Sequence, residues 1–249
     1  MNRRAHSRDR REEEHSGTKK RKTKKQREKE ILVHTVLLGV GILAGVLLIL
    51  LFFKFINNSP AQVSSKVENV RYDIGDPTKQ VSMPELDVQL LTVNEFSRPG
   101  TPTDKITGVV VHYTANPGST AQNNRDYFEN LKDTQDNKVS SNFVIGLDGE
   151  IIQCIPTSEV AYASNSRNND TVSIECCHPD ESGEFTDATY QSLVELVAFL
   201  CGKFDLSMDD VIRHYDVTGK DCPKYFVENE NEWLEFKSDV AKYIEENGE

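Results

Sequence analysis

The sequence predicts an α/β domain with a central mixed β-sheet flanked by helices, preceded by one N-terminal transmembrane helix. Strand-like and helix-like segments alternate from about residue 105 to residue 246, which is the pattern of an α/β fold. Two apolar segments are joined through Asp148-Gly149, a hairpin signal, so one strand pair is expected to be antiparallel and the sheet mixed. A separate apolar run near the N-terminus predicts the membrane helix.

The individual elements follow from local residue patterns. Short apolar, β-branched runs predict strands at 105–114, in the two halves of 141–155, at 170–177 and at 209–216. Helices are predicted at 119–133, 186–204 and 230–246. The second helix begins with Thr186 and Asp187 as possible caps and places apolar residues at helical spacing: Tyr190, Leu193, Leu196, Val197 and Leu200.

Charge is distributed unevenly along the 249 residues. Residues 1–30 carry 13 Lys/Arg against 6 Asp/Glu, a net charge of +7, and the remaining residues carry a net charge of −18. A basic arm can indicate nucleic-acid binding. Here an uncharged apolar run follows the arm, and anionic lipid headgroups would attract it. A membrane partner is therefore expected, and no nucleic acid.

Residues 31–56 are predicted to be a transmembrane anchor. The 19 residues from Thr35 to Phe53 contain no charge, which is long enough to cross the hydrocarbon core of a bilayer as a helix. The Lys/Arg cluster before this run keeps the N-terminus cytoplasmic by the positive-inside rule, so the acidic body is expected outside the cell. A cleaved signal peptide is the alternative, but the run is long and no clear small-x-small site follows it.

The chain is thus expected to have four parts. They are a basic cytoplasmic arm at 1–30, the anchor at 31–56, an extracellular linker at 57–85 and a folded domain at 86–249. The linker lacks sustained apolar periodicity and contains Pro, Ser and Asn. The folded part is long enough to bury a substantial core. The sequence leaves the oligomeric state open.

The cysteines of an exported domain can form disulfides, and this chain has five: Cys154, Cys176, Cys177, Cys201 and Cys222. Adjacent Cys176 and Cys177 point to opposite faces of a strand, so they would not pair simply with each other. Cys201 falls in an apolar helical run, where a buried free thiol is common. Reduced, packed cysteines are favoured over disulfides.

Three residues are candidate metal ligands: His112 at the end of the first long strand, and His214 and Cys222 further along the chain. Two imidazoles and a thiolate are ligands that zinc favours, and three protein ligands leave a fourth position for water. A zinc-bound water has a pKa of about 7 and is a hydrolytic nucleophile at neutral pH. The spacing alone does not establish the site. A structural histidine and a buried thiol before Pro223 are the alternatives.

The segments around these residues carry a family resemblance. They are NEFSRPGTP, VVVHYTANPGSTAQNNRDYFENL, SSNFVIGLDGEIIQCIP, TVSIECCHP and RHYDVTGKDCP. In this order, from about Asn94 to about Pro223, they resemble the zinc-dependent N-acetylmuramoyl-L-alanine amidases, a fold family shared with animal peptidoglycan recognition proteins. The resemblance implies Zn²⁺ bound by His112, His214 and Cys222. It also implies the glycan and stem peptide of peptidoglycan as substrate, and cleavage of the amide between N-acetylmuramic acid and L-alanine.

The resemblance also assigns two catalytic residues. Glu175 matches the catalytic Glu of several bacterial amidases, which takes the proton of the water and returns it to the leaving nitrogen. A charge within an otherwise apolar strand is costly to bury without a partner, which favours a role in a site. Lys220 matches the family's catalytic Lys and would stabilise the oxyanion, with an ordinary solvated loop lysine as the alternative.

Some relatives carry a Tyr near the zinc where this chain has Ser141 beside Asn142, so a Tyr-assisted variant of the mechanism is in doubt here. His178 follows two cysteines, but adjacent residues on a strand cannot converge on one metal, so it is not expected to be a ligand. Five residues in loop-like stretches are candidates for contacts with glycan or stem peptide, with plain surface as the alternative: Asn116, Tyr162, Ser164, Asn165 and Arg167.

The sequence therefore predicts a membrane-anchored, outward-facing zinc amidase. Two other functions are compatible with it. One is a non-catalytic peptidoglycan-binding module, as found among relatives that have lost a zinc ligand, although all three ligands are present here. The other is an anchored cell-wall scaffold whose basic cytoplasmic arm recruits a partner.

Overall fold

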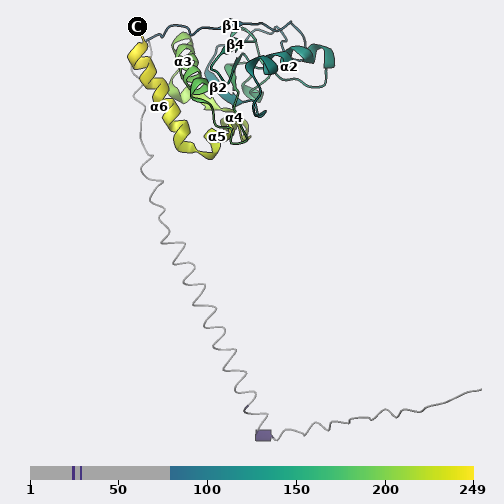
Figure 1. Cartoon of the computed structure of the whole chain (residues 1–249), viewed down its shortest axis with the longest axis vertical. Coiled ribbons are helices and arrows are strands. Elements are labelled where there is room, and N and C mark those ends of the chain that lie inside the picture. Colours follow the sequence, from purple (N-terminus) through teal and green to yellow (C-terminus); the bar gives the residue numbers. More distant parts are fainter. Residues whose placement is uncertain (1–23, 26–28, 30–78) are drawn as a thin grey trace, which may run out of the picture. The chain divides into compact units, whose positions relative to one another are not determined.

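A computed structural model describes residues 24, 25, 29 and 79–249 (Figure 1). The predicted anchor at 31–56 lies outside the described residues, as do most of the predicted arm and linker. Among the residues that are described, no helix combines the length and the apolar character needed to cross a bilayer. Membrane anchoring therefore stays a prediction from the sequence.

A mixed sheet organises the described part of the domain. Its six strands are β1 (Asp87–Val88), β2 (Gly108–Tyr113), β3 (Phe143–Ile145), β4 (Ile151–Gln153), β5 (Thr171–Cys176) and β6 (Val211–Arg213). They are arranged in the order β1-β4-β3-β5-β2-β6. β3 and β4 are antiparallel and the other neighbouring pairs are parallel, which confirms the mixed sheet. β1 was not predicted, because two residues are too few to show a periodicity.

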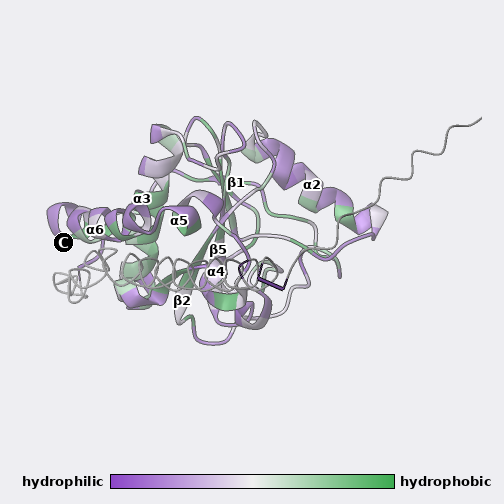
Figure 2. Ribbon diagram, turned by 90° about the horizontal axis from the view of Figure 1, so that it is seen from below, coloured by the Kyte–Doolittle hydropathy of each residue, from purple (hydrophilic) through white to green (hydrophobic). Residues whose placement is uncertain are grey.

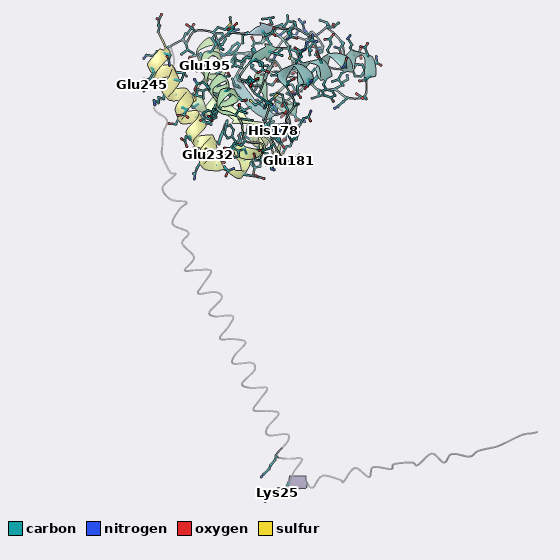
Figure 3. The ribbon with its side chains drawn as sticks, in the orientation of Figure 1. Lys25, His178, Glu181, Glu195, Glu232 and Glu245 are labelled. Atoms are coloured by element: carbon teal, nitrogen blue, oxygen red, sulfur yellow. The ribbon has the colours of Figure 1, made fainter. Side chains whose placement is uncertain are left out.

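Three long helices accompany the sheet: α2 (Ala121–Thr134), α3 (Asp187–Phe204) and α6 (Glu230–Asn247). The side chain of Thr186 accepts a hydrogen bond from the backbone N–H of Thr189, so the predicted cap of α3 is confirmed. α2 begins with a reciprocal capping box between Thr120 and Asn123. Glu195 is carried on α3, and Glu232 and Glu245 are carried on α6 (Figure 3).

The predicted strand at 209–216 is wrong in its second half. β6 ends at Arg213, and the chain continues as a short helix, α4 (His214–Thr218), followed by α5 (Lys224–Glu228). Asp216 explains the change, because its carboxylate accepts a hydrogen bond from the backbone N–H of Arg213 at 2.8 Å and caps the new helix. Two short 3₁₀ turns, η1 (Asn165–Arg167) and η2 (Met208–Asp210), complete the fold.

The sheet is buried on both faces, as Figure 2 shows from the hydrophobic strands between α3 and α6 on one side and α2 on the other. Alternate residues of β2 and β5 enter the core under α3 and α6; they are Val109, Val111, Val172, Ile174 and Cys176. Because side chains alternate along a strand, His112 and Glu175 project from the opposite face. The five cysteines are free and buried, and Cys176 and Cys177 belong to the cores on opposite faces, as expected.

Candidate metal centre

The structure brings His112, His214 and Cys222 together. One potential ligand atom from each lies within 4.8 Å of the other two. The Sγ atom of Cys222 is 3.8 Å from Nδ1 of His112, and the two imidazole centroids are 4.7 Å apart. All three side chains are buried, with at most 6% of each residue exposed. The group therefore has the compactness and the burial of a metal centre.

The topology of the sheet explains how residues distant in sequence meet. β2 and β6 are parallel neighbours, so their carboxyl ends lie at the same edge of the sheet. His112 is near the end of β2, and His214 is the first residue after β6. Gly219 directly follows α4, and its φ of +76° reverses the chain. Cys222 then returns to the start of α4, where its carbonyl oxygen accepts a hydrogen bond from the N–H of Tyr215 at 2.9 Å.

Both imidazoles make their outer contacts through Nε2, which leaves Nδ1 of His112 facing the Cys222 thiol and Nδ1 of His214 without a partner. Nε2 of His112 is 3.1 Å from Oγ of Ser164, and Nε2 of His214 is 2.8 Å from Oδ1 of Asn165. Nδ1 of His214 is buried and has no hydrogen-bond partner, which is costly unless something else binds it. Two imidazole nitrogens and one sulfur are the donor set of a tetrahedral zinc site with one open position. The residues therefore fit a zinc ion.

Burial shifts the pKa values of the three candidate ligands. It lowers the pKa of His112 well below its ordinary value, with further lowering by the charges of His214 and Lys220. Burial and Lys220 also lower the pKa of His214, so both rings favour the neutral form that binds metals. In the protein without metal, burial raises the pKa of the Cys222 thiol to about 12. Metal binding at this group would therefore release the thiol proton.

Glu175 lies directly beside the three candidate ligands. Its Oε1 atom is 3.9 Å from Nδ1 of His112, and its Oε2 atom is buried without a hydrogen-bond partner. Burial raises the pKa of Glu175 to about 8, although the positive charge of Lys220 opposes this shift. A carboxyl group beside a potential metal site is suited to accept and return a proton, and the positive charge of a bound metal would favour its carboxylate form.

Lys220 lies in the turn between α4 and Cys222, and its side chain is exposed. Its charge acts on His112, His214 and Glu175, which places it at the edge of the same site. Its carbonyl oxygen accepts a hydrogen bond from the N–H of Cys222 at 2.7 Å, so the turn that presents Cys222 also presents Lys220. The structure thus brings together all five residues that the sequence singled out; their individual roles stay predictions.

His178 and Ser141 lie apart from the candidate ligands. His178 is outside the group of three; its Nδ1 donates to the carbonyl oxygen of Asp180 at 2.7 Å and its ring packs 5.1 Å from that of Tyr113. Figure 3 shows His178 together with Glu181, whose carbonyl oxygen accepts a hydrogen bond from Lys224 of α5. Ser141 is buried, and its hydroxyl donates to the carbonyl oxygen of Ser173 at 3.0 Å.

The sequence did not reveal which residues contact the two imidazoles. Ser164 and Asn165 were predicted only as possible substrate contacts, and the structure places them against His112 and His214. Arg167, predicted in the same way, pairs with Asp170 at 2.9 Å. No sequence spacing could indicate these contacts, because Ser164 is 52 residues from its histidine and Asn165 is 49 from its own.

Comparison with known proteins finds a family that matches part of the chain. Residues 102–225 match the family model described as N-acetylmuramoyl-L-alanine amidase. The N-acetylmuramoyl-L-alanine amidase CwlL of Bacillus licheniformis is 35% identical over 164 residues, which cover 61% of this chain and 45% of CwlL. The N-acetylmuramoyl-L-alanine amidase BlyA of Bacillus subtilis (strain 168) is 33% identical over 172 residues, covering 60% of this chain and 45% of BlyA.

The chain thus spans about half the length of the curated relatives that it matches. Among solved structures, that of PlyL aligns with a TM-score of 0.55 and 24% identity, covering 63% of this chain and 97% of PlyL. At this identity the likeness supports the fold, a central sheet flanked by helices. Residues 102–225 therefore match the amidase type 2 family, and the relatives that share this region are themselves named N-acetylmuramoyl-L-alanine amidases.

Proposed function

We propose that the domain hydrolyses the amide bond between N-acetylmuramic acid and L-alanine in peptidoglycan, with a zinc ion held by His112, His214 and Cys222. The observation that carries this proposal is the convergence of one donor atom from each of the three residues within 4.8 Å, beside a buried Nδ1 of His214 that has no hydrogen-bond partner. The family match and the amidase names of the relatives support the substrate and the bond.

A zinc ion in this group would supply a bound water of lowered pKa and a positive charge that polarises the scissile carbonyl group. Glu175 then takes up the proton of the attacking water at its carboxylate and passes it to the leaving amide nitrogen. Its position 3.9 Å from Nδ1 of His112 supports this role, because the carboxyl group reaches the neighbourhood of the metal without being one of the three ligands.

Lys220 would stabilise the oxyanion that forms when water adds to the carbonyl carbon. It is exposed at the edge of the site and thus accessible to a polymeric substrate. Its charge already acts on the buried residues of the site in the absence of substrate. Substitution of this lysine should therefore reduce turnover to a greater extent than it reduces the affinity for zinc.

We place the domain outside the cell, held by one uncleaved helix at residues 31–56. The support is the sequence of the N-terminal region, in which an arm of net charge +7 precedes 19 uncharged residues. A bacterium with a single membrane and an external wall fits this arrangement best, because the domain would face its substrate directly. The linker at 57–85 would let the domain reach the wall.

The two non-catalytic alternatives do not require a catalytic site. A pure binding module needs no zinc and no proton acceptor, whereas this chain has three candidate ligands close together and Glu175 beside one of them, which supports catalysis. The test is digestion of purified peptidoglycan by the full-length protein, followed by mass spectrometry of the fragments. We expect new L-alanine amino termini, loss of hydrolysis on chelation and recovery with zinc. Full hydrolysis by metal-free protein would refute the mechanism, and zinc binding without hydrolysis would favour a scaffold.

A further inference from the structure

The loop between β4 and β5 contacts both imidazoles of the candidate metal centre on the side away from the open Nδ1 atoms. Two consecutive residues of this loop make the contacts. Oγ of Ser164 is 3.1 Å from Nε2 of His112, and Oδ1 of Asn165 is 2.8 Å from Nε2 of His214. Both distances are within hydrogen-bond range.

The chemistry of the Asn165 contact determines which nitrogen of His214 carries the proton. An amide oxygen can only accept a hydrogen bond, so Nε2 of His214 must be the donor. A neutral imidazole with its proton on Nε2 has a lone pair on Nδ1. That Nδ1 atom is buried and unpartnered in the structure, so it is the atom that is available to a metal.

The hydroxyl group of Ser164 makes the corresponding contact with His112, in which it can accept from Nε2 or donate to it. Only 1% of Ser164 is exposed, so solvent has little access to its hydroxyl group. The Oγ atom instead lies within hydrogen-bond distance of Nε2 of His112. When the hydroxyl accepts from Nε2, the lone pair of His112 lies on Nδ1, which is the atom 3.8 Å from Sγ of Cys222. In that state both rings carry the free lone pair on Nδ1.

The loop that carries these residues is held in place without help from a metal. Oδ1 of Asn168 accepts hydrogen bonds from the backbone N–H groups of Ala163, at 3.2 Å, and Ser164, at 2.6 Å. The side chain of Arg167 pairs with Asp170 at 2.9 Å and also donates to Thr107. This support keeps the two side chains in position before any ion binds.

The backbone of Asn165 is itself unusual. Its φ of +53° lies in the left-handed region, which few residues adopt and which asparagine tolerates better than most. The residue is exposed, yet its side chain reaches back to His214. Glycine tolerates the same backbone, so Asn165→Gly removes the amide group without imposing strain on the turn.

We propose that Ser164 and Asn165 are positioning residues that hold His112 and His214 in the tautomer with the proton on Nε2, so that both Nδ1 atoms face a bound zinc ion. The zinc part of this inference rests on the proposed function, whereas the tautomer part does not. Outer hydrogen bonds of this kind typically change metal affinity by about 10- to 100-fold.

The first test uses the full-length protein, free of metal and labelled with ¹⁵N at histidine. Long-range ¹H–¹⁵N spectra distinguish the two neutral tautomers of each ring, and the His112 and His214 signals are assigned with single variants. We expect both rings to be protonated at Nε2. Asn165→Gly should give a mixture of tautomers at His214 only, and Ser164→Ala should do so at His112 only. Protonation of His214 at Nδ1 in the wild-type protein would overturn the proposal.

The second test measures zinc dissociation constants by competition with a chromogenic chelator. Asn165→Gly should bind zinc about 10 to 100 times more weakly. Asn165→Asp keeps an oxygen acceptor and should recover most of this loss, and Ser166→Ala, in the same turn, should match the wild type. Equal affinity in wild type and Asn165→Gly would refute the proposal even if the wild type cleaves peptidoglycan. The expected losses of affinity in a protein that does not cleave peptidoglycan would refute only the proposed function.

Discussion

His112 and Glu175 occupy paired positions on the parallel strands β2 and β5, and Nδ1 of the histidine lies 3.9 Å from Oε1 of the glutamate. Side chains at paired positions project from the same face of a sheet, so the register of the two strands brings the carboxyl group to the candidate ligand. A slip of one residue would turn Glu175 towards the core under α3. The apolar residues that alternate with the pair therefore fix both the core and the site.

Glu175→Gln tests whether this carboxyl group transfers a proton. The substitution keeps the size of the side chain and its capacity for hydrogen bonds but removes the proton acceptor. Peptidoglycan hydrolysis should fall by about 10²- to 10⁴-fold, the usual contribution of a general acid–base group. Zinc content, measured by atomic absorption, and substrate binding should be nearly unchanged, because Glu175 is outside the group of three candidate ligands.

The matched control is Glu181→Gln, which changes an exposed carboxyl group on the loop after β5. This variant should hydrolyse peptidoglycan at the wild-type rate. Loss of zinc from Glu175→Gln would mean that Glu175 is a ligand and that the site has been misassigned. Near-normal turnover would mean that another group transfers the proton.

His112→Ala and His178→Ala should differ sharply, although both histidines are buried. His112→Ala removes one of three converging donor atoms, so the protein should lose stoichiometric zinc and its hydrolytic activity. His178→Ala removes a ring that packs on Tyr113 and bonds Asp180, so it should keep its zinc even if its thermal stability is lower. A zinc-free, folded His178→Ala protein would contradict the assignment of ligands.

Much of the fold was predictable because its long elements carry strong periodic patterns. The helices at 186–204 and 230–246 and the hairpin around Gly149 were predicted within one or two residues where the pattern or turn signal was clear. α4 was missed because a helix of five residues is too short to show a helical period. Only the capping of Arg213 by Asp216, a contact of the folded chain, ends the strand there.

The residues of the candidate site likewise fall into those that the sequence predicted and those that it did not. His112, Glu175, His214, Lys220 and Cys222 were predicted because family motifs mark them, and the structure brings them together. Ser164 and Asn165 were predicted as possible substrate contacts, with plain surface as the alternative, because polar residues in a loop do not indicate their partner. Their contacts depend on where the β4–β5 loop crosses the sheet edge, and no local pattern encodes that position.

The predicted anchor can be tested by topology in cells. In intact cells stripped of their wall, external protease should remove the domain while a tag on the N-terminus stays protected, since the basic arm is expected to remain cytoplasmic. Detection of both ends by immunoblotting, with lysed cells as the control, gives the orientation. A soluble mature form that begins after Ile56 would instead support cleavage of a signal peptide.

Glu129 holds the segment before β2 against helix α2. Its carboxylate accepts hydrogen bonds from the backbone N–H and the hydroxyl group of Thr92, at 3.0 and 2.7 Å, and pairs with Lys132 at 3.1 Å. Burial alone would raise the pKa of Glu129, but the bonds from Thr92 and Lys132 outweigh it and lower the pKa to about 2. The charged form is thus favoured in the folded protein.

This shift predicts a specific acid sensitivity. A pKa lowered from 4.5 to about 2 means that the folded state binds fewer protons than the unfolded state in this range. The stabilisation is therefore fully present above pH 4.5 and is lost as the pH falls through 2, with a size of roughly 3 kcal/mol at most.

Glu129→Gln should lower the free energy of unfolding at pH 7, and its difference from wild type should shrink towards pH 2 in urea titrations. The exposed carboxyl group of Glu245 provides the control, because Glu245→Gln should follow the wild type throughout. A difference between Glu129→Gln and wild type that does not change with pH would show that the side chain acts through packing and not through its charge.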